Sequence, residues 1–235
     1  MRYARAAATV LGVAACAGVD RWTRGTRATR AEKQLPPPGD RLVVDPMWQA
    51  TRATTICAPR DTVWPWLVQM GYPTHRAGWY IPYWMDRLLF GIRARSANEI
   101  VRELQQLAVG DRVPDSPDGQ VSCFTVAGIE KDRALVLISH THPVPICRDV
   151  DFSWAFVLEN DSRLLMRARI SYTPVGPAPV IRGSIAAAFG IGDVVQAGAM
   201  LRGIRRRAES RAQHGTEDPR AHLALGDDQA ALTGR

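Results

Sequence analysis

The sequence predicts one α+β domain in which a curved antiparallel β-sheet wraps around a long C-terminal α-helix. Four segments between residues 120 and 172 alternate apolar and polar side chains with a period of two, as neighbouring antiparallel strands do. After a proline-rich bend at residues 173–179, the apolar residues take helical spacing as far as about residue 211. The chain has 235 residues, 46% of them hydrophobic, which suits one mid-sized core with flanking segments.

The first part of this domain predicts a strand followed by a helix. The β-branched run at residues 51–57 is typical of a strand. Pro59 suits the first turn of a helix that continues to about Met70. Pro65 lies inside that helix, where it removes one backbone hydrogen bond and favours a kink.

Two further helices are expected before the main strands begin. Residues 82–90 predict a short helix closed by Gly91. Ser96 and Glu99 have the spacing of a capping box, in which each side chain satisfies an unpaired backbone amide. The apolar stripe that follows predicts a helix over residues 97–107.

The main strands are expected at residues 120–129, 134–142, 150–159 and 163–172. The apolar faces of the last two strands carry Phe152, Trp154, Phe156 and Leu158, and Leu164, Met166, Ala168, Ile170 and Tyr172. Arg167 and Arg169 fall on the opposite face. Because a sheet covered on one side leaves its other side wet, we expect these two arginines in solvent.

Four glycines interrupt the pattern of the C-terminal helix, which is expected over residues 180–211. They are Gly190, Gly192, Gly198 and Gly203. Glycine weakens a helix, and it also lets a helix approach another backbone closely. The sequence leaves both outcomes open: close approach to the sheet, or a break near residues 190–192.

The net charge of +7 belongs to the ends of the chain. Residues 1–33 carry +5, residues 201–211 carry +4 and residues 212–235 carry −2, so the middle is neutral. A nucleic-acid-binding domain needs a basic folded face, so no nucleic acid is expected as a partner. Basic ends are instead suited to an anionic membrane surface.

The N-terminus resembles a targeting or anchoring segment. Residues 6–19 are uncharged and mostly apolar, too short for a bilayer span of about 20 residues and typical of a signal peptide. Residues 13–16 resemble a bacterial lipobox, which makes Cys16 a lipidation candidate. We therefore expect the protein to be membrane-associated or exported. A cytoplasmic protein with a frayed N-terminus is the alternative.

The chain divides into four predicted parts. Residues 1–19 form the signal, lipoprotein-like or anchoring segment, and residues 20–45 form a basic, proline-rich tether. Residues 46–212 form the folded domain. Residues 213–235 are polar and acidic and are expected to be disordered.

Several short phrases carry a resemblance to a known superfamily. They are Ala58-Pro59 before Val63-Trp64-Pro65-Trp66-Leu67-Val68-Gln69-Met70-Gly71; Arg76-Ala77-Gly78-Trp79-Tyr80; Glu103-Leu104-Gln105 through Val109-Gly110-Asp111; Arg133-Ala134-Leu135-Val136-Leu137; and Met200-Leu201-Arg202-Gly203-Ile204-Arg205. With the order of elements, these phrases resemble the START-like superfamily of polyketide cyclases or dehydrases and lipid-transport proteins (SRPBCC), in an uncharacterised bacterial branch.

The resemblance covers about residues 42–211 and implies the helix-grip fold. Members of the branch often carry an N-terminal membrane-proximal segment. The superfamily mostly binds hydrophobic ligands between helix and sheet, and a minority of its members are cyclases, dehydratases or other enzymes. The matching phrases mark the fold, and no reaction follows from them.

An aromatic cluster provides the first candidate site. Trp79, Tyr80, Tyr83 and Trp84 lie close together in the sequence, with Asp86 just beyond them. Aromatic walls with a few polar tips are typical of ligand pockets. The alternative is ordinary packing of a short helix over the sheet, with Asp86 as the solvated partner of an arginine.

Two histidines provide the second candidate. His140 and His142 lie two apart on one face of a predicted strand, where they could bind a metal or relay a proton. Metal sites normally need a third protein ligand, and no carboxylate lies at a sequence spacing that would indicate one. Neither a metal nor another cofactor is therefore expected. The plain alternative is a solvent-facing strand end. Trp154 is expected in the core or in the cavity wall, which nearly coincide in this fold.

Other motifs are absent or neutral. The spacing of Cys57, Cys123 and Cys147 fits no zinc site, so they are expected in the core, although Cys123 and Cys147 could pair in an exported protein. The sequence has no phosphate-binding glycine loop, no G-x-S-x-G and no H-E-x-x-H. These absences disfavour nucleotide-dependent and hydrolytic enzymes.

Three functions remain. The leading one is binding, and with it transport or sequestration, of a hydrophobic small molecule in a cavity between the sheet and the C-terminal helix. The second is a cyclase or dehydratase acting on a polyketide-like or other hydrophobic substrate, with Tyr83, Asp86 or His140 moving protons. The ligand would contact Trp79, Tyr80, Tyr83, Trp84, Trp154 and His140. The third is a membrane-docked interaction module without a ligand.

Overall fold

The computed structural model describes residues 25–144, 147–160, 162–176 and 178–216. The elements are α2 (Arg30–Gln34), η1 (Asp40–Leu42), β1 (Trp48–Thr55), α3 (Arg60–Val68), α4 (Tyr83–Leu89), η2 (Arg102–Leu104), β2 (Arg112–Pro114), β3 (Cys123–Glu130), β4 (Ala134–Ser139), β5 (Cys147–Glu159), β6 (Arg163–Pro174), α5 (Ala178–Gly192), the π-helical η3 (Asp193–Ala197) and α6 (Gly198–Thr216). Cys16 and the rest of the expected anchor, residues 20–24 of the expected tether and residues 217–235 of the expected tail lie outside the described residues.

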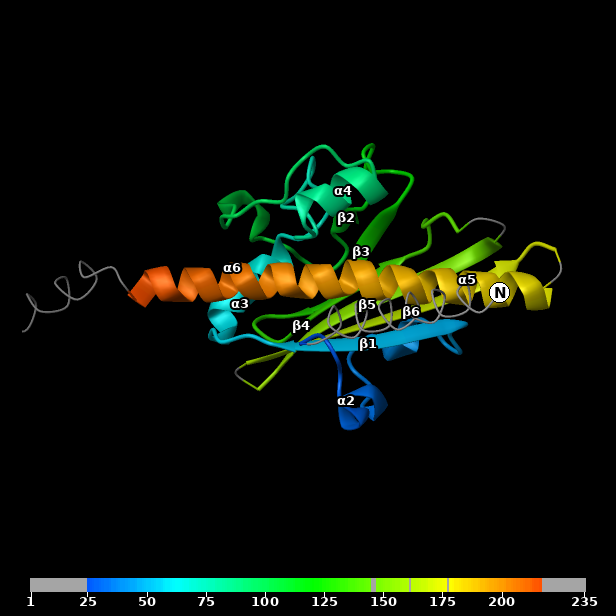
Figure 1. Cartoon of the computed structure of the whole chain (residues 1–235), viewed down its shortest axis with the longest axis horizontal. Helices are drawn as coiled ribbons and strands as arrows, with labels where there is room; N and C mark the ends of the chain where they lie inside the picture. Colours follow the sequence, from blue (N-terminus) through cyan, green and yellow to red (C-terminus); the bar gives the residue numbers. More distant parts are fainter. Residues whose placement is uncertain (1–24, 145–146, 161, 177, 217–235) are drawn as a thin grey trace, which may run out of the picture.

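The strands form one six-stranded antiparallel sheet in the order β1-β6-β5-β4-β3-β2. Figure 1 shows α5, η3 and α6 as one long rod that lies across this curved sheet. The predicted α+β helix-grip architecture is therefore confirmed. The four strands expected from alternation are all present, whereas β2 was not predicted because its three residues are too few to show a period.

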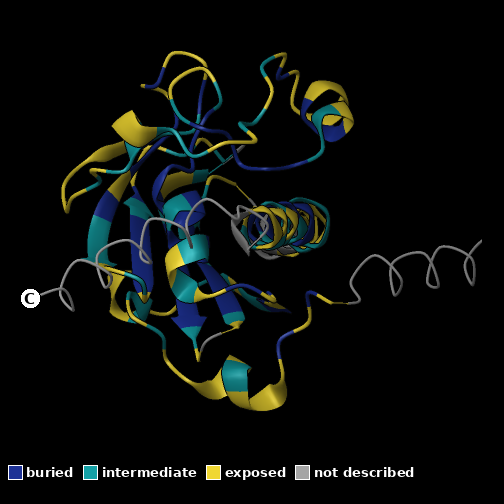
Figure 2. Ribbon diagram, turned by 90° about the vertical axis from the view of Figure 1, so that its left-hand side faces the viewer, coloured by how far each residue is buried: buried dark blue, intermediate teal, exposed yellow. Residues whose placement is uncertain are grey.

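The core lies between the inner face of the sheet and the C-terminal helix. Phe152 and Trp154 on β5 pair with Ile170 and Ala168 on β6, so the apolar faces of both strands point the same way. Met200, on α6, is fully buried against this layer. Figure 2 shows the buried residues gathered between sheet and helix.

The C-terminal helix does not break at its glycines. It continues from α5 into α6, and between them it widens into the π-helical turn η3, one residue after Gly192. At Gly203 the helix closely approaches another backbone, as glycine permits. That backbone belongs to Tyr80 and not to the sheet. A Cβ added there would overlap the backbone carbonyl of Tyr80.

The helix expected over residues 97–107 is wrong. Only the short turn η2 forms, and the Ser96 hydroxyl accepts a hydrogen bond from the Tyr80 amide at 3.0 Å instead of capping a helix. The buried Gln69 side chain replaces the missing helical bonds. It donates to the Glu99 carbonyl at 3.0 Å and accepts from the Val101 amide at 2.9 Å. The Gln69 side chain, just after α3, thus satisfies backbone groups of Glu99 and Val101 while this segment stays non-helical.

The expectation that Arg167 and Arg169 lie in solvent is also wrong. Arg167 is 4% exposed, and its guanidinium bonds to the Asp40 carboxylate at 2.6 Å. Arg169 reaches the same Asp40 oxygen at 3.0 Å. Arg163, on the same strand, binds the Glu32 carboxylate at 2.7 Å. The outer face of β6 is therefore covered, and its arginines are paired.

The cover is the described part of the expected tether, residues 25–45, which we call the N-terminal strap. Its Ala28 packs with Ala53, Ala134, Val157 and Leu165 in a small second core. Figure 1 shows α2, within the strap, on the opposite side of β1 from the C-terminal helix. The strap's acidic side chains meet the outer-face arginines, and this ion pairing explains why a polar, proline-rich segment lies on the sheet.

Candidate functional site

A cavity of about 290 Å³ lies between the inner face of the sheet and the π-helical turn. Strands β1, β5 and β6 form its floor, and α5 with η3 forms its roof. Its lining residues are Trp48, Asp115, His142, Phe152, Trp154, Ala168, Ala188, Phe189, Gly192, Asp193, Gln196 and Ala197. Single π-turns inside α-helices occur frequently at functional sites, and here the turn lies directly over the cavity.

Four large aromatic side chains, Trp48, Phe152, Trp154 and Phe189, line the cavity. Phe152 and Trp154 lie 5.7 Å apart on β5, and Phe124, behind them on β3, is 5.2 Å from Phe152. Trp48 and Phe189 face each other at 5.6 Å, so strand β1 and helix α5 close one end together. These tilted and edge-to-face geometries are the favourable ones for aromatic pairs. The wall is therefore rigid, apolar and preformed.

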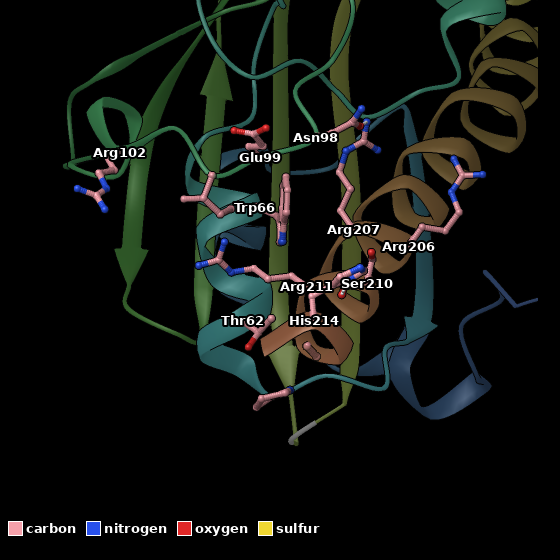
Figure 3. A pocket seen from close by; sticks show the side chains of 13 residues that line it. Thr62, Trp66, Asn98, Glu99, Arg102, Arg206, Arg207, Ser210, Arg211 and His214 are labelled. Carbon is pink, nitrogen blue, oxygen red and sulfur yellow. Dashed lines mark hydrogen bonds between the residues drawn. The ribbon is translucent and has the colours of Figure 1, made fainter. Parts of the chain in front are cut away.

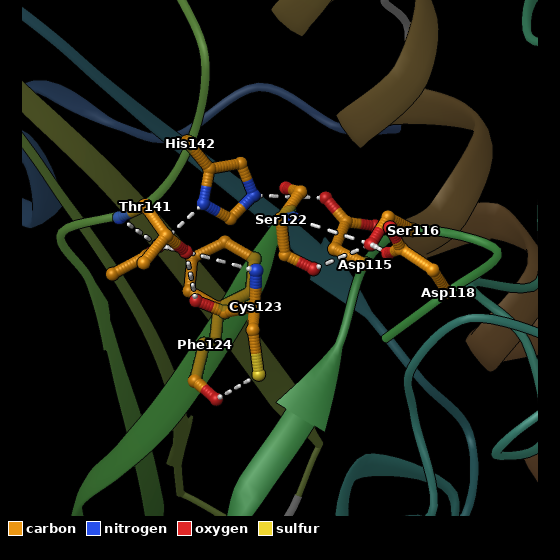
Figure 4. A network of polar contacts seen from close by, with 9 residues as sticks. Asp115, Ser116, Asp118, Ser122, Cys123, Phe124, Thr141 and His142 are labelled. Carbon is orange, nitrogen blue, oxygen red and sulfur yellow. Dashed lines mark hydrogen bonds and ion pairs between the residues drawn. The ribbon is translucent and has the colours of Figure 1, made fainter. Parts of the chain in front are cut away.

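His142 forms a polar wall of the cavity. Its Nδ1 lies 2.6 Å from the Ser139 hydroxyl and its Nε2 lies 3.0 Å from Asp115 Oδ2 (Figure 4). Since a carboxylate accepts hydrogen bonds, the Nε2–H group donates to Asp115, and Nδ1 is paired with the Ser139 hydroxyl. The ring also packs on Phe124, with 4.4 Å between centroids. Both ring nitrogens have partners, so the His142 ring is held in one orientation at the cavity wall.

The loop that carries Asp115 is held by its own polar network (Figure 4). Ser116 donates to Asp118 at 2.7 Å, and the amides of Gln120 and Val121 donate to the same carboxylate oxygen. These hydrogen bonds lower the pKa of Asp118 to about 2. Asp118 therefore stays ionised at neutral pH and keeps the loop, and with it Asp115, in place.

An ion pair closes another side of the cavity. Arg52 on β1 binds Asp193 on η3 at 2.6 Å, and both side chains are largely buried. Burial raises the pKa of Asp193, while the hydrogen bond and the charge of Arg52 lower it. Asp193 lines both the cavity and an outer groove of about 390 Å³ beside the strap. The pair thus stands between the cavity and the outside along β1.

The structure divides the candidate aromatic residues. Trp154 lines the cavity, and Trp79 packs behind it at 5.3 Å. Tyr80 is fully buried, its hydroxyl donates to the Trp66 carbonyl at 2.9 Å, and burial raises its pKa. Tyr83 and Trp84 do not line the cavity. The Arg95 guanidinium lies 4.2 Å over the Tyr83 ring, and Trp84 is exposed.

The candidate histidine pair is also divided. His140 is exposed beyond the end of β4, where its Nδ1 lies 2.6 Å from Asp151. His142 alone faces the cavity, with Asp115 as its partner. Within the described ranges, no three His, Cys, Asp or Glu side chains gather in a way that could hold a metal ion. Cys57, Cys123 and Cys147 are free thiols.

Asp86 is buried on α4 but does not line the cavity. Desolvation raises the pKa of its carboxyl from 3.8 to about 6. Because this folded-state pKa exceeds the unfolded one, the folded protein binds more protons between about pH 4 and 6. The contribution of Asp86 to stability is therefore present at low pH and is lost as the pH rises through this window.

Replacing Asp86 with asparagine should remove this dependence. We expect Asp86→Asn to raise the free energy of unfolding at pH 7 by roughly 1–2 kcal/mol, because the amide carries no charge to desolvate. At pH 4 the two proteins should differ little. Urea unfolding followed by circular dichroism from pH 4 to 7 measures this. Parallel pH profiles of the two proteins would contradict the raised pKa.

A larger but open groove of about 1410 Å³ lies between α3, the loop at residues 98–102 and the end of α6 (Figure 3). Its charged side chains include Arg206, Arg207 and Arg211. Figure 3 shows Arg207 turned to Asn98, and its guanidinium bonds to that side chain at 2.9 Å. Arginines line much of this groove and Trp66 is the one Trp, Tyr or Phe among its described lining residues, so the aromatic cavity is the better candidate for binding an apolar molecule.

Comparison with known proteins does not show a family for this chain. No protein-family model matches the chain, and no curated protein matches it. Protein NE0264 from Nitrosomonas europaea is 13% identical, with a TM-score of 0.41 over 72% of this chain and 98% of its own. SA2116 from Staphylococcus aureus, a protein of unknown function, is 11% identical, with a TM-score of 0.42 over 70% and 95%. Ara h 8.0201 is 12% identical, with a TM-score of 0.35 over 69% and 97%.

The chain has an α+β helix-grip fold. At 11–13% identity and TM-scores no higher than 0.42, these three similarities say nothing about a ligand or a reaction. The residues of the cavity itself must therefore carry any functional argument.

Several residues that line the cavity were not identified as candidates from the sequence. Phe152 was available from the alternating face that also holds Trp154. Phe189, Asp193 and Gln196 fall four and three residues apart, a helical stripe that could have been read as one face. Asp115 had no such signal, because it follows a strand too short to recognise.

Proposed function

We propose that this protein binds a hydrophobic small molecule in the cavity between its sheet and its C-terminal helix. The observation that supports this most is the preformed aromatic wall together with a few fixed polar groups. Ligand pockets are typically concave, mostly apolar and preformed, with a small number of polar groups that orient the ligand. Such a cavity stabilises a ligand by about 25 cal/mol per Å² of apolar area removed from water, before ordering costs.

The cavity's size and chemistry narrow the ligand class. A volume of about 290 Å³ lies at the lower end of the usual range for ligand sites, roughly 300–1,000 Å³. A two-chain phospholipid is too large for it. Gln196 offers an amide donor, whereas the other polar side chains of the wall, Asp115, His142 and Asp193, are held in pairs. A compact ring system or short chain with one hydrogen-bond acceptor fits these features.

Native mass spectrometry of the full chain tests the proposal directly. The protein would be purified without detergent, and anything released by organic extraction would be identified. We expect a reproducible bound mass from an apolar compound. A protein that stays free of ligand, and that binds no member of a panel of small aromatic and isoprenoid compounds, would contradict the proposal.

Filling the cavity should abolish binding without unfolding the protein. Ala197 is buried in the cavity roof, so Ala197→Leu places a larger side chain in the ligand's space. We expect at least tenfold weaker binding in a titration followed by tryptophan fluorescence. The matched control is Ala187→Leu, at an exposed position of α5 that does not line the cavity, and it should bind normally. Equal affinity of the two variants would place the ligand elsewhere.

The cyclase or dehydratase alternative lacks a supporting observation in the described part of the chain. Tyr83, Asp86 and His140, its three proton carriers, do not line the cavity. His142 does line it, but both of its ring nitrogens already have partners. Binding, with transport or sequestration, is therefore the function that we propose. Membership of the uncharacterised bacterial branch, membrane anchoring or export through residues 1–19, and lipidation of Cys16 stay predictions.

A further inference from the structure

Helix α4 presents an exposed apolar surface. Four large side chains on α4 and the residue after it, which we call the α4 patch, are Trp84, Leu88, Leu89 and Phe90, with exposed fractions of 60%, 75%, 52% and 46%. Scattered single apolar residues are common on protein surfaces, whereas a contiguous group marks an interaction site.

The α4 patch belongs to a fixed part of the fold. Met85 and Asp86, on the other face of α4, are buried in the body of the protein. The backbone carbonyl of Asp86 accepts hydrogen bonds from the amides of Phe90 at 3.2 Å and of Ile92 at 2.9 Å, which fold the chain back after the helix. Figure 1 shows α4 at the outer edge of the molecule, on the opposite side of the C-terminal helix from β1. The patch is therefore held outward by packing beneath it.

The rim of the α4 patch is basic. Arg87, Arg93 and Arg95 are all exposed, and the guanidinium of Arg95 is held over the ring of Tyr83. The one acid in residues 83–95 is Asp86, which is buried. The surface around the patch thus carries three positive charges with no exposed negative charge from its own segment.

From this arrangement we propose that the α4 patch docks the protein on an anionic lipid bilayer. Trp84, Leu88 and their apolar neighbours enter the boundary between headgroups and acyl chains, as tryptophan and leucine do in interfacial helices. The rim arginines meet lipid phosphates and anionic headgroups. A second copy of the chain fits less well, because a symmetric contact through the patch would bring two sets of three arginines together.

The docking is assigned to α4 and not to the C-terminal helix. By length and composition Gly183–His214 could cross a membrane, with a mean hydropathy of 1.4. However, Met200, Leu201 and Ile204 of that helix are buried in the core, so inserting it would dismantle the domain. The patch needs no such rearrangement. Its docking is also independent of whether the cavity holds a ligand.

The test reads contact at α4 itself, because residues 1–33 of the full chain could add membrane affinity of their own. Full-length protein and the Trp84→Phe variant are mixed with vesicles of phosphatidylcholine and phosphatidylserine that contain brominated acyl chains. Bromine quenches only tryptophans that reach the chains. The emission of the wild type minus that of the variant is the emission of Trp84. We expect this emission difference to fall at least threefold when the acyl chains are brominated. If bromination leaves this emission difference unchanged, the proposal is overturned.

Two sets of variants separate the patch from its rim. Leu88→Ser with Leu89→Ser should remove the Trp84 quenching, whereas Val109→Ser with Val121→Ser, at exposed apolar positions outside the patch, should not. Replacing Arg87, Arg93 and Arg95 with glutamine should lower partitioning of the protein onto phosphatidylserine vesicles by about fivefold per arginine. Partitioning onto neutral vesicles should change little. Quenching that survives the double serine change would overturn the proposal. So would a dimer in solution that this change dissociates, because the patch would then be a contact between copies.

Discussion

Replacing Arg167 with alanine is expected to lower the free energy of unfolding by about 3–5 kcal/mol. Its guanidinium makes four hydrogen bonds while almost wholly buried: to Thr51 at 3.0 Å, to Asp40 at 2.6 Å, and to the carbonyls of Glu32 and Lys33 at 3.2 and 2.8 Å. Removing it takes donors from two carbonyls and leaves the Asp40 carboxylate with Arg169 as its remaining cationic partner, so a buried network loses its central member. Chemical unfolding followed by circular dichroism measures the loss.

Arg133 provides the matched control for Arg167. It pairs with Glu130 at 2.8 Å, but both side chains are more than half exposed, so Arg133→Ala should cost less than about 1 kcal/mol. Arg167→Lys should recover only part of the loss, because an ammonium group cannot reproduce the planar fork of donors. If Arg167→Ala costs no more than Arg133→Ala, the strap does not contribute to the stability of the domain.

Gly203→Ala is the second change with a large expected effect. Alanine is the better helix former by about 1 kcal/mol, so helix propensity alone predicts stabilisation. In the structure the new Cβ would overlap the Tyr80 carbonyl oxygen and lie 2.8 Å from Tyr80 Cβ. Tyr80 is buried and its backbone is fixed from both sides, so the overlap has no flexible side chain to absorb it. We expect a net loss of roughly 2–4 kcal/mol in the free energy of unfolding.

Gly190→Ala separates packing from propensity. No atom lies within 4 Å of the position that its Cβ would take, so this change should stabilise the protein by about 0.5–1 kcal/mol. The two variants make the same chemical change in one continuous helix and should move stability in opposite directions. A Gly203→Ala protein as stable as the wild type would show that α6 does not approach the Tyr80 backbone this closely.

The fold could be predicted where one element's own pattern decides its structure. Strands β5 and β6 carry apolar residues at alternate positions from Phe152 to Leu158 and from Leu164 to Tyr172, and these faces line the core. The predicted helix at residues 97–107 failed because Gln69, about 30 residues earlier, satisfies the same backbone groups in another conformation. The prediction that Arg167 lies in solvent was wrong for a related reason. Alternation identifies the two faces of a strand but not what covers each face.

The candidate site was predictable only in part. Trp154 followed from the alternation of its strand. The polar groups of the cavity depend on partners that lie far away in the sequence: His142 meets Asp115 across 27 residues, and Arg52 meets Asp193 across 141. A single sequence holds no local signal for such pairs. Only Trp84 of the α4 patch belonged to the aromatic cluster noted in the sequence, and the outward direction of the patch depends on how Met85 and Asp86 pack.

The π-helical turn has a consequence for how the cavity can change. Such a turn accommodates one residue more than an α-helix does over the same length. Deleting a single residue from Asp193–Ala197 would therefore let this segment form a regular α-helical turn, while α5 and α6 kept nearly the same rotation about their common axis. Phe189 would still face the cavity, and the change would fall on the roof, which holds Asp193, Gln196 and Ala197. The π-helical turn is thus a place where the roof of the cavity can lose a residue without turning either half of the helix.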